Sequence, residues 1–225
     1  MSKNLIKEKE YAAKEASKLL KDNQIVGLGT GSTAYYAIIE IGKLVSQGLN
    51  IRAIPTSEES MELAKKLGIP LIDINTVDHI DITFDGADEF TSDLQLIKGG
   101  GGALLREKII ASLTTDNIII ADSSKKVALL GKFTLPIEVI PMAYQYVLAR
   151  LQSLGGKGTI RKKDDVTFIT DEGNYIIDTD FGLIENPSGL ALELNQIVGL
   201  VEHGLFLNLA KKVIMGNGET VVTFD

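Results

Sequence analysis

Residues 94–107 read Leu94-Gln-Leu-Ile97-Lys98-Gly99-Gly100-Gly101-Gly102-Ala-Leu-Leu-Arg-Glu107, and a helical pattern continues to Leu113. Glycine loses more backbone entropy on folding than any other residue, so four in a row indicate a linker or a close approach of backbone to ligand. A linker does not fit here, because a strand-like run precedes the glycines and a helix follows them. The segment predicts a strand–loop–helix junction whose amide groups form an anion site at a helix N-terminus.

Glu107 lies on the apolar side of this predicted helix. At ~100° per residue, its neighbours on the helix surface are Ala103, Leu104, Ile110 and Ala111. One interpretation is that Glu107 reaches the surface or pairs with Arg106 or Lys108, since charged side chains are rarely buried without a partner. The other is a general base whose pKa is raised by desolvation. The segment by itself leaves both open.

The composition is that of an ordinary soluble globular protein. The chain has 225 residues, of which 44% are hydrophobic and 24% charged, and this length suits one large domain or two small ones. A formal net charge of −7 argues against nucleic acid as a partner, because phosphate neutralisation needs a basic surface. Local amides and one or two lysines can still bind a small phosphate.

Cysteine is absent from the chain, which excludes disulfides, thiolate chemistry and cysteine-ligated metals. The histidines, His79 and His203, are far apart in sequence and are interpreted as surface or strand-end residues. Residues 1–21 are charged and lack the apolar core of a signal peptide. No window reaches the ~18 to 20 apolar residues of a membrane span. We expect a cytoplasmic protein with no membrane partner, no metal and no cofactor.

Short apolar runs alternate with helical patterns in the first part of the chain. Strands are expected at 25–28, 51–54, 71–73, 80–84, 94–97 and 118–121, and helices at 32–46, 57–67 and 103–113. Strands that alternate with helices of ~10 to 15 residues are typical of β-α-β units. We predict an α/β fold with a Rossmann-like, mostly parallel sheet.

The pattern changes near residue 133. Strands are expected at 135–140, 159–161, 166–170, 175–178 and 200–203, and helices at 142–154 and 189–197. Strand, helix, strands, helix, strand is the order of a ferredoxin-like α+β unit. Strands near 212–215 and 220–224 are expected to rejoin the first sheet. The predicted domains are a Rossmann-like catalytic domain, residues 1–131 plus 204–225, and an inserted ferredoxin-like domain, residues 132–203.

A candidate phosphate site follows the first predicted strand. The loop Gly29-Thr30-Gly31-Ser32-Thr33 leads into a helix, where its groups can either cap the helix or bind phosphate. A dinucleotide fingerprint would need glycine in place of Ser32, and a P-loop would need a Gly-Lys-Ser/Thr ending. An ordinary capped turn and a phosphate site both remain open for this loop.

Other polar segments follow predicted strands, at the sheet edge where ligands of open α/β folds bind. Pro55-Thr-Ser-Glu-Glu59 reads as a capped helix start. Asp85-Gly86-Ala87-Asp88-Glu89 carries more carboxylates than a turn needs. Asp122-Ser-Ser-Lys125-Lys126 offers either a solvated lysine pair or a cation at the site. Together these groups suit a small sugar phosphate and enolisation, in which a base removes a proton beside a carbonyl and a donor stabilises the oxyanion.

At these residues the chain resembles the type A ribose-5-phosphate isomerase family. Four segments carry the resemblance in order: Gly27-Leu-Gly-Thr-Gly-Ser-Thr33, Asp85-Gly-Ala-Asp-Glu89, Lys98-Gly-Gly-Gly-Gly-Ala-Leu-Leu-Arg-Glu-Lys108 and Ala121-Asp-Ser-Ser-Lys125. The segments Leu130-Gly-Lys-Phe133 and Leu135-Pro-Ile-Glu-Val-Ile-Pro141 are also similar. The resemblance covers nearly the whole chain.

The resemblance implies metal-free interconversion of D-ribose 5-phosphate and D-ribulose 5-phosphate in the non-oxidative pentose phosphate pathway. It implies that Glu107 moves a proton between C2 and C1 through a cis-enediolate. Lys98 and the amides of its loop would stabilise the enediolate oxygen. Asp85 would assist ring opening and proton movement on the hydroxyls, and Asp88 would bind and orient the sugar.

The remaining site residues follow from the same resemblance. The sugar is expected to contact Gly86, Ala87, Gly99, Gly100 and Gly101. The phosphate is expected at Thr30, Gly31, Ser32, Thr33 and Lys125, together with Lys9 from the N-terminal helix. Family members are oligomers, so we expect a homodimer or homotetramer.

Two other functions compete with this one. A sugar-phosphate sensor of a transcriptional regulator would carry a DNA-binding module, and both the acidic charge and the short segment before the first strand oppose it. A nucleotide-dependent dehydrogenase is disfavoured by Ser32. We therefore expect the phosphate at residues 29–33, the loop of residues 98–102 facing the reacting carbons, and Glu107 as the catalytic base.

Overall fold

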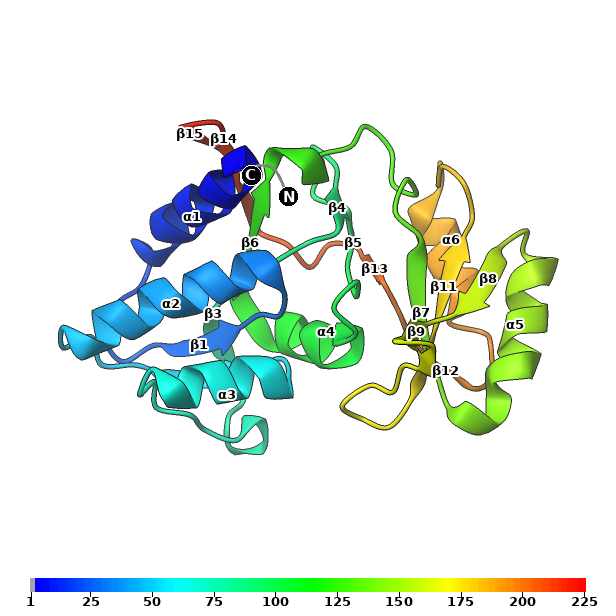
Figure 1. Ribbon diagram of the computed structural model, residues 1–225, viewed down its shortest axis with the longest axis horizontal. Coiled ribbons are helices and arrows are strands. Elements are labelled where there is room, and N and C mark those ends of the chain that lie inside the picture. The colour runs from blue at the N-terminus through cyan, green and yellow to red at the C-terminus, as the bar shows by residue number, and fades with distance from the viewer. Residues whose placement is uncertain (1–2) are drawn as a thin grey trace.

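A six-stranded sheet forms the centre of the larger part of the molecule (Figure 1). In the computed structural model, which describes residues 3–225, the strand order is β15-β14-β6-β3-β1-β2. The strands are β1 (Ile25–Leu28), β2 (Arg52–Pro55), β3 (Ile80–Asp85), β6 (Thr114–Asp122), β14 (Lys212–Asn217) and β15 (Thr220–Phe224). All neighbours pair in parallel except β15, which is antiparallel to β14. The predicted mostly parallel α/β sheet is confirmed.

The order of the sheet reverses between β1 and β3, because β2 lies on one side of β1 and β3 on the other. This is the switch point of a doubly wound sheet, where the loops at the carboxyl ends of the two strands diverge and leave a crevice for a ligand. The fold therefore places the loops after Leu28 and Asp85 side by side at a binding position.

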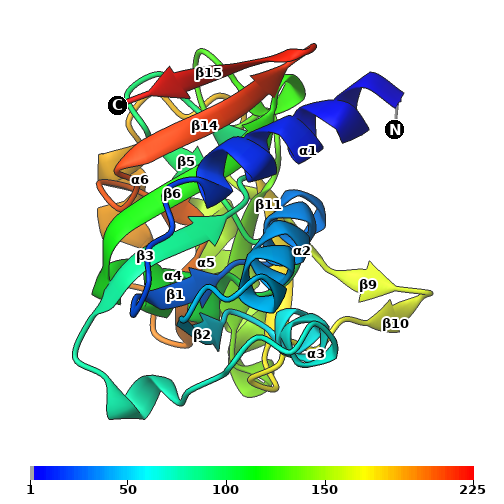
Figure 2. The ribbon, with the colours of Figure 1, turned by 90° about the vertical axis from the view of Figure 1, so that its left-hand side faces the viewer.

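Helices cover both faces of this sheet (Figures 1 and 2). α1 (Lys3–Ser17), α2 (Ser32–Ser46) and α3 (Glu58–Lys66) lie on one face, and α4 (Leu104–Leu113) lies on the other. Along β6, Ile118 and Ile120 pack under α1 and α2, while Ile119 and Ala121 face the side of α4. Side chains of a strand alternate between faces, so a strand covered on both sides reads as the unbroken apolar run seen at 118–121.

The strand before the glycine loop is not part of the parallel sheet. β5 (Leu96–Ile97) lies in a small antiparallel sheet between β4 (Glu89–Phe90) and β13 (Leu205–Phe206). Leu94 has a left-handed φ of 61°, so a turn occupies the start of the expected strand. The expected strand at 71–73 is also wrong, since Leu71 makes only an isolated bridge to Ala53.

A second sheet forms the part on the right of Figure 1. Its order is β12-β7-β11-β8, with every pair antiparallel. The elements are β7 (Leu135–Val139), η3 (Pro141–Ala143), α5 (Tyr144–Ser153), β8 (Lys157–Ile160), β11 (Tyr175–Asp180), α6 (Pro187–Leu194) and β12 (Leu200–His203). A hairpin of β9 (Lys162–Lys163) and β10 (Val166–Thr167) projects from it (Figure 2). The β-α-β-β-α-β order is the expected ferredoxin-like plan; the domain boundaries at 132 and 203 stay a prediction.

The helix α4 lies between the two sheets. It contacts β3 and β6 on one side and β7 and β12 on the other (Figure 1). Residues at its N-terminus, including the glycine loop and Glu107, therefore lie where the two parts of the molecule meet.

Within residues 3–225, no helix has the length and apolar character needed to cross a membrane.

Candidate active site

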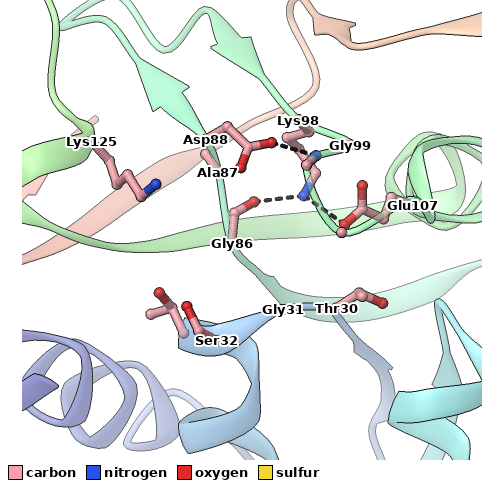
Figure 3. A pocket seen from close by; sticks show the side chains of 13 residues that line it. Thr30, Gly31, Ser32, Gly86, Ala87, Asp88, Lys98, Gly99, Glu107 and Lys125 are labelled. Carbon is pink, nitrogen blue, oxygen red and sulfur yellow. Dashed lines mark hydrogen bonds and ion pairs between the residues drawn. The ribbon is translucent and has the colours of Figure 1, made fainter. Parts of the chain in front are cut away.

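The loops after β1, β3, β5 and β6 surround one cavity (Figure 3). Its walls are formed by Thr30, Gly31, Ser32, Thr33, Gly86, Ala87, Asp88, Lys98, Gly99, Gly100, Gly101, Glu107 and Lys125. Each of these residues was predicted from the sequence as part of the site. Two other predicted residues, Asp85 and Lys9, lie behind the walls. The structure thus brings the predicted residues together, while their roles stay predictions.

The loop after β1 presents the open N-terminus of α2 to the cavity. Among the residues that the structure describes, no side chain caps this helix, whose N-cap is Gly31 with a left-handed φ of 96°. Its first amide groups are therefore available to an anion. Gly29 is required for another reason, because a Cβ there would lie 2.3 Å from Oδ1 of Asp85. The β1 and β3 loops can approach only through a residue without a side chain.

A hydroxyl network holds the same loop from the side of α3. Thr30 Oγ1 lies 2.7 Å from Thr56 Oγ1 and 2.8 Å from Ser57 Oγ, and Ser60 Oγ donates to the carbonyl of Gly29 at 2.6 Å. Ser57 also caps α3 by accepting from the Ser60 amide, as predicted. The sequence did not indicate that this capped helix start also positions Thr30.

Lys98 joins the carboxylates of two different elements. Its Nζ lies 3.0 Å from Asp85 Oδ2 and 3.2 Å from Glu107 Oε1, and it donates to the carbonyl of Gly86 at 2.6 Å. Burial opposes the charged form of Lys98, but the Asp85 and Glu107 carboxylates outweigh it and raise its pKa. Lys98 is therefore a buried cation with its three donors directed at oxygens.

Asp85 is fixed beneath the cavity. It is 2% exposed, and its Oδ1 accepts from the amides of Thr30 at 3.1 Å and Gly86 at 2.7 Å. One carboxylate therefore ties the β1 loop, the β3 loop and Lys98 together.

Glu107 is buried on the cavity wall with one oxygen uncommitted. The residue is 5% exposed, and its Oε2 has no hydrogen-bond partner among the residues that the structure describes. Burial raises the pKa of Glu107 to about 8, with repulsion from Asp85 and Asp88 adding to the shift and the Lys98 ammonium opposing it. A carboxylate with a free oxygen and a raised pKa is suited to accept a proton near neutral pH.

The structure excludes the surface interpretation of Glu107. Arg106 pairs with Asp171 and Glu172, and Lys108 pairs with Glu202. Both neighbouring cations therefore point away from Glu107.

The glycine run is explained by backbone conformation and by close packing. Gly99 and Gly102 have left-handed φ values of 102° and 88°, which β-carbon-bearing residues rarely adopt. Gly100 donates its amide to Asp88 Oδ2 at 2.7 Å, and a Cβ at Gly100 would lie 2.4 Å from Asp88 Oδ1. The loop of residues 98–102 can thus lie directly against Asp88.

Lys125 and Lys9 occupy different positions near the open end of α2. Lys125, in the 3₁₀ helix η2 (Ser123–Lys125), lines the cavity. Lys9 is 1% exposed; its Nζ donates to Ser32 Oγ at 2.7 Å and lies 3.6 Å from Asp122 Oδ2. Lys9 is therefore behind the loop, where it holds Ser32, and not on the wall where a direct phosphate contact was expected.

The described residues contain no group of three His, Asp or Glu side chains arranged to hold a metal ion. His203 ends β12 and is buried. Burial, together with the nearby Lys108 ammonium, lowers its pKa to about 3, so His203 is neutral at physiological pH. His79 is exposed beside Asp78. Neither histidine lines the cavity.

Comparison with known sequences identifies relatives along nearly the whole chain. The family profile of Ribose 5-phosphate isomerase A (phosphoriboisomerase A) matches residues 52–220. Ribose-5-phosphate isomerase A of Bacillus mycoides (strain KBAB4) is 52% identical over 209 residues, which cover 92% of this chain and 95% of the relative. The protein of that name from Limosilactobacillus reuteri (strain DSM 20016) is 51% identical over 213 residues, 94% of each chain.

Solved structures agree with this comparison. A D-ribose-5-phosphate isomerase in complex with phospho-erythronic acid is 40% identical, with a TM-score of 0.95 over 98% of both chains. Ribose 5-phosphate isomerase A from Methanocaldococcus jannaschii is 44% identical, with a TM-score of 0.91 over 96% of both chains. The resemblance found in the four sequence segments is confirmed, and this chain belongs to the ribose 5-phosphate isomerase A family of aldose–ketose isomerases.

Proposed function

We propose that this chain interconverts D-ribose 5-phosphate and D-ribulose 5-phosphate by proton transfer through a cis-enediolate. The observation that carries the proposal is the carboxylate of Glu107, which is buried on the cavity wall with Oε1 beside Lys98 and Oε2 free. A base in this position can accept a carbon-bound proton, and its neighbour can stabilise the charge that develops on the substrate oxygen.

The phosphate of the substrate binds at the open N-terminus of α2. Four consecutive residues of that loop, 30–33, line the cavity, and no side chain in the described part of the chain caps the helix start. Lys125 lies on the same cavity wall and adds a positive charge. Amides and one lysine thus replace the large basic surface that this acidic chain lacks.

Proton transfer takes place at the opposite end of the cavity, beside Glu107 and Lys98. Oε2 of Glu107 removes the proton from C2 of the open-chain aldose, and the electron pair moves to form the enediolate. Lys98 stabilises the enediolate oxygen while the proton of the C2 hydroxyl passes to the oxygen on C1. Glu107 then returns the carbon-bound proton to C1, so that the carbonyl forms at C2 of the ketose. Bringing base and cation together in a buried site strengthens both interactions relative to water.

The two aspartates have different positions and so different roles. Asp88 lies on the wall and orients the sugar hydroxyls. Asp85, behind the wall, holds Lys98 in place at 3.0 Å. A direct part for Asp85 in ring opening, which the family resemblance implies, requires a substrate hydroxyl to reach its carboxylate past Lys98.

We also propose a homodimer or homotetramer that acts in the cytoplasm. Large apolar side chains are exposed on the ferredoxin-like part, including Met142 at 92%, Val198 at 79% and Leu192 at 68%, and burial of such side chains favours association. Sedimentation equilibrium measures the assembly directly, and a monomer would contradict this part of the proposal.

The experiment that tests the activity is an isomerase assay with ribose 5-phosphate, with and without a chelator. We expect formation of ribulose 5-phosphate at the same rate in both samples. Activity that disappears with the chelator would contradict the metal-free mechanism. Binding of ribose 5-phosphate without turnover would favour the sugar-phosphate sensor.

A further inference from the structure

We propose that Arg161, which belongs to the ferredoxin-like part, is a positioning residue. It sets the direction of the backbone amides in the loop of residues 98–102. Its Nη1 donates to the carbonyls of Gly99 at 2.8 Å and Gly100 at 3.1 Å. One guanidinium nitrogen therefore holds two successive peptide groups of the loop that follows Lys98. The inference rests on the proposed function, because it assigns these amides to the oxyanion of that reaction.

The two contacts fix where the amide protons point. In a trans peptide the N–H is directed opposite to the C=O of the same unit. Because Arg161 holds the carbonyl of Gly99, the amide of Gly100 points away from Arg161, and it donates to Asp88 Oδ2 at 2.7 Å. Because Arg161 also holds the carbonyl of Gly100, the amide of Gly101 points away from it too.

The amide of Gly101 is the group that this arrangement prepares for substrate. Gly101 is exposed and lines the cavity, and its N–H has no hydrogen-bond partner among residues 3–225. Glycine in this loop has no side chain that would fix the peptide direction, so an external contact must do so. A donor held in place before the reaction stabilises an oxyanion without reorganisation during turnover.

Arg161 is itself held on three sides. Its Nε donates to Asp178 Oδ2 at 2.9 Å and its Nη2 to the other oxygen of the same carboxylate. Its amide donates to the carbonyl of Ile176 at 2.7 Å. The guanidinium carbon Cζ lies over the ring of Phe168, 5.9 Å from its centroid, and a Cβ at Gly102 would lie 2.5 Å from that ring. Only a planar fork with several donors satisfies the carboxylate and both carbonyls together.

The test compares wild type with Arg161→Lys and Arg161→Ala. The lysine variant keeps the charge but cannot hold Asp178 and both carbonyls at once. We expect kcat to fall by about 10- to 100-fold in both variants, the scale on which a small misplacement of catalytic groups acts, with KM little changed. Inhibition by inorganic phosphate should be unchanged, because the phosphate end of the cavity is not touched.

Phospho-erythronic acid gives a readout that does not depend on turnover. Its carboxylate is a planar anion that can accept from the loop amides, so calorimetry should show weaker binding to Arg161→Lys by about tenfold, the loss expected for a charge-assisted hydrogen bond. Binding of inorganic phosphate to the same variant should match wild type.

The matched control is Arg106→Ala. Arg106 also joins the two parts of the molecule, through Asp171 and Glu172, but within residues 3–225 its side chain forms no hydrogen bond or ion pair with the loop. It should lower the melting temperature while kcat and phospho-erythronic acid binding stay near wild type.

The proposal is overturned if Arg161→Lys folds and keeps wild-type kcat and phospho-erythronic acid affinity. It is also overturned if Arg106→Ala loses as much kcat and as much phospho-erythronic acid affinity as Arg161→Lys does. The loss would then result from weakening any contact between the two parts of the molecule. A wild-type protein that binds phospho-erythronic acid but lacks isomerase activity would refute the proposed reaction alone. The binding comparison would still decide the role of Arg161.

Discussion

Replacing Lys98 by methionine removes a buried charge while keeping a side chain of similar length. The Nζ that is lost lies 3.0 Å from Asp85 Oδ2, 3.2 Å from Glu107 Oε1 and 2.6 Å from the carbonyl of Gly86. The substitution therefore leaves two carboxylates and one carbonyl without their common donor. Lys98→Met should affect stability and catalysis separately.

The size of each effect follows from these contacts. Removing one partner of a buried ion pair costs about 3–5 kcal/mol, because the other charge stays buried and uncompensated. Protonation of Glu107, whose pKa is raised by burial, relieves part of that cost. Loss of an oxyanion donor lowers kcat by about 10²- to 10³-fold. Removal of the ammonium also raises the pKa of Glu107 further, because the attraction to Lys98 that opposes this shift is gone.

The assay is denaturant unfolding of wild type and Lys98→Met across about pH 5 to 9, together with kcat at each pH. In the variant, the native Glu107 carboxyl holds a proton that the unfolded chain releases, so its free energy of unfolding falls as the pH rises. The destabilisation should be small in acid and larger in base. Lys108→Met is the control, because Lys108 is a partly buried lysine next to Glu107 on α4 that pairs with Glu202; this variant should keep its kcat.

Two results would refute this reasoning. A destabilisation that is the same at every pH would mean that Lys98 does not compensate the buried carboxylate of Glu107. Wild-type kcat in Lys98→Met would mean that the ammonium does not act on the oxyanion.

Three further predictions concern the pH dependence, the glycine loop and the phosphate end. The kcat/KM of wild type should rise with pH through the pKa of Glu107, about 8, because only the carboxylate accepts a proton. A kcat/KM that does not change with pH near 8 would contradict the role of Glu107 as the base. Gly100→Ala places a Cβ 2.4 Å from Asp88 Oδ1 and should lower kcat/KM by about 10- to 100-fold, whereas Gly101→Ala, 3.3 Å from Thr30 Cγ2, should lose less; equal losses would contradict this. Lys125→Ala should raise KM and weaken inorganic phosphate inhibition by about tenfold with kcat retained, and a variant that loses only kcat would show a different role.

Much of the fold could be predicted because its signals are local. The apolar run at 118–121 and the helical pattern at 32–46 each reflect burial of one element, and both appear in the structure as expected. The cavity could be predicted because parallel strands present their carboxyl ends at one edge. The strand before the loop of residues 98–102 was predicted less well. It has only two residues, Leu96–Ile97, and it pairs in a separate antiparallel sheet.

Contacts from behind the cavity could not be predicted. Lys9 reaches Ser32 only because α1 packs beside α2, and Ser60 reaches Gly29 across two elements. Arg161 reaches Gly99 across 62 positions of sequence, from a part of the chain with no motif of its own. Each contact depends on how distant elements pack together, and this packing cannot be predicted from a local sequence pattern.

The most direct test of the central claim is Glu107→Gln assayed in D₂O with ribose 5-phosphate. Glutamine keeps the shape of the side chain and removes the base, so turnover and deuterium uptake at C1 of the product should fall together by about 10²- to 10⁴-fold. Inorganic phosphate should bind as in wild type, because the proposed phosphate site is at the other end of the cavity. Wild-type turnover or wild-type deuterium uptake in Glu107→Gln would show that another group moves the proton.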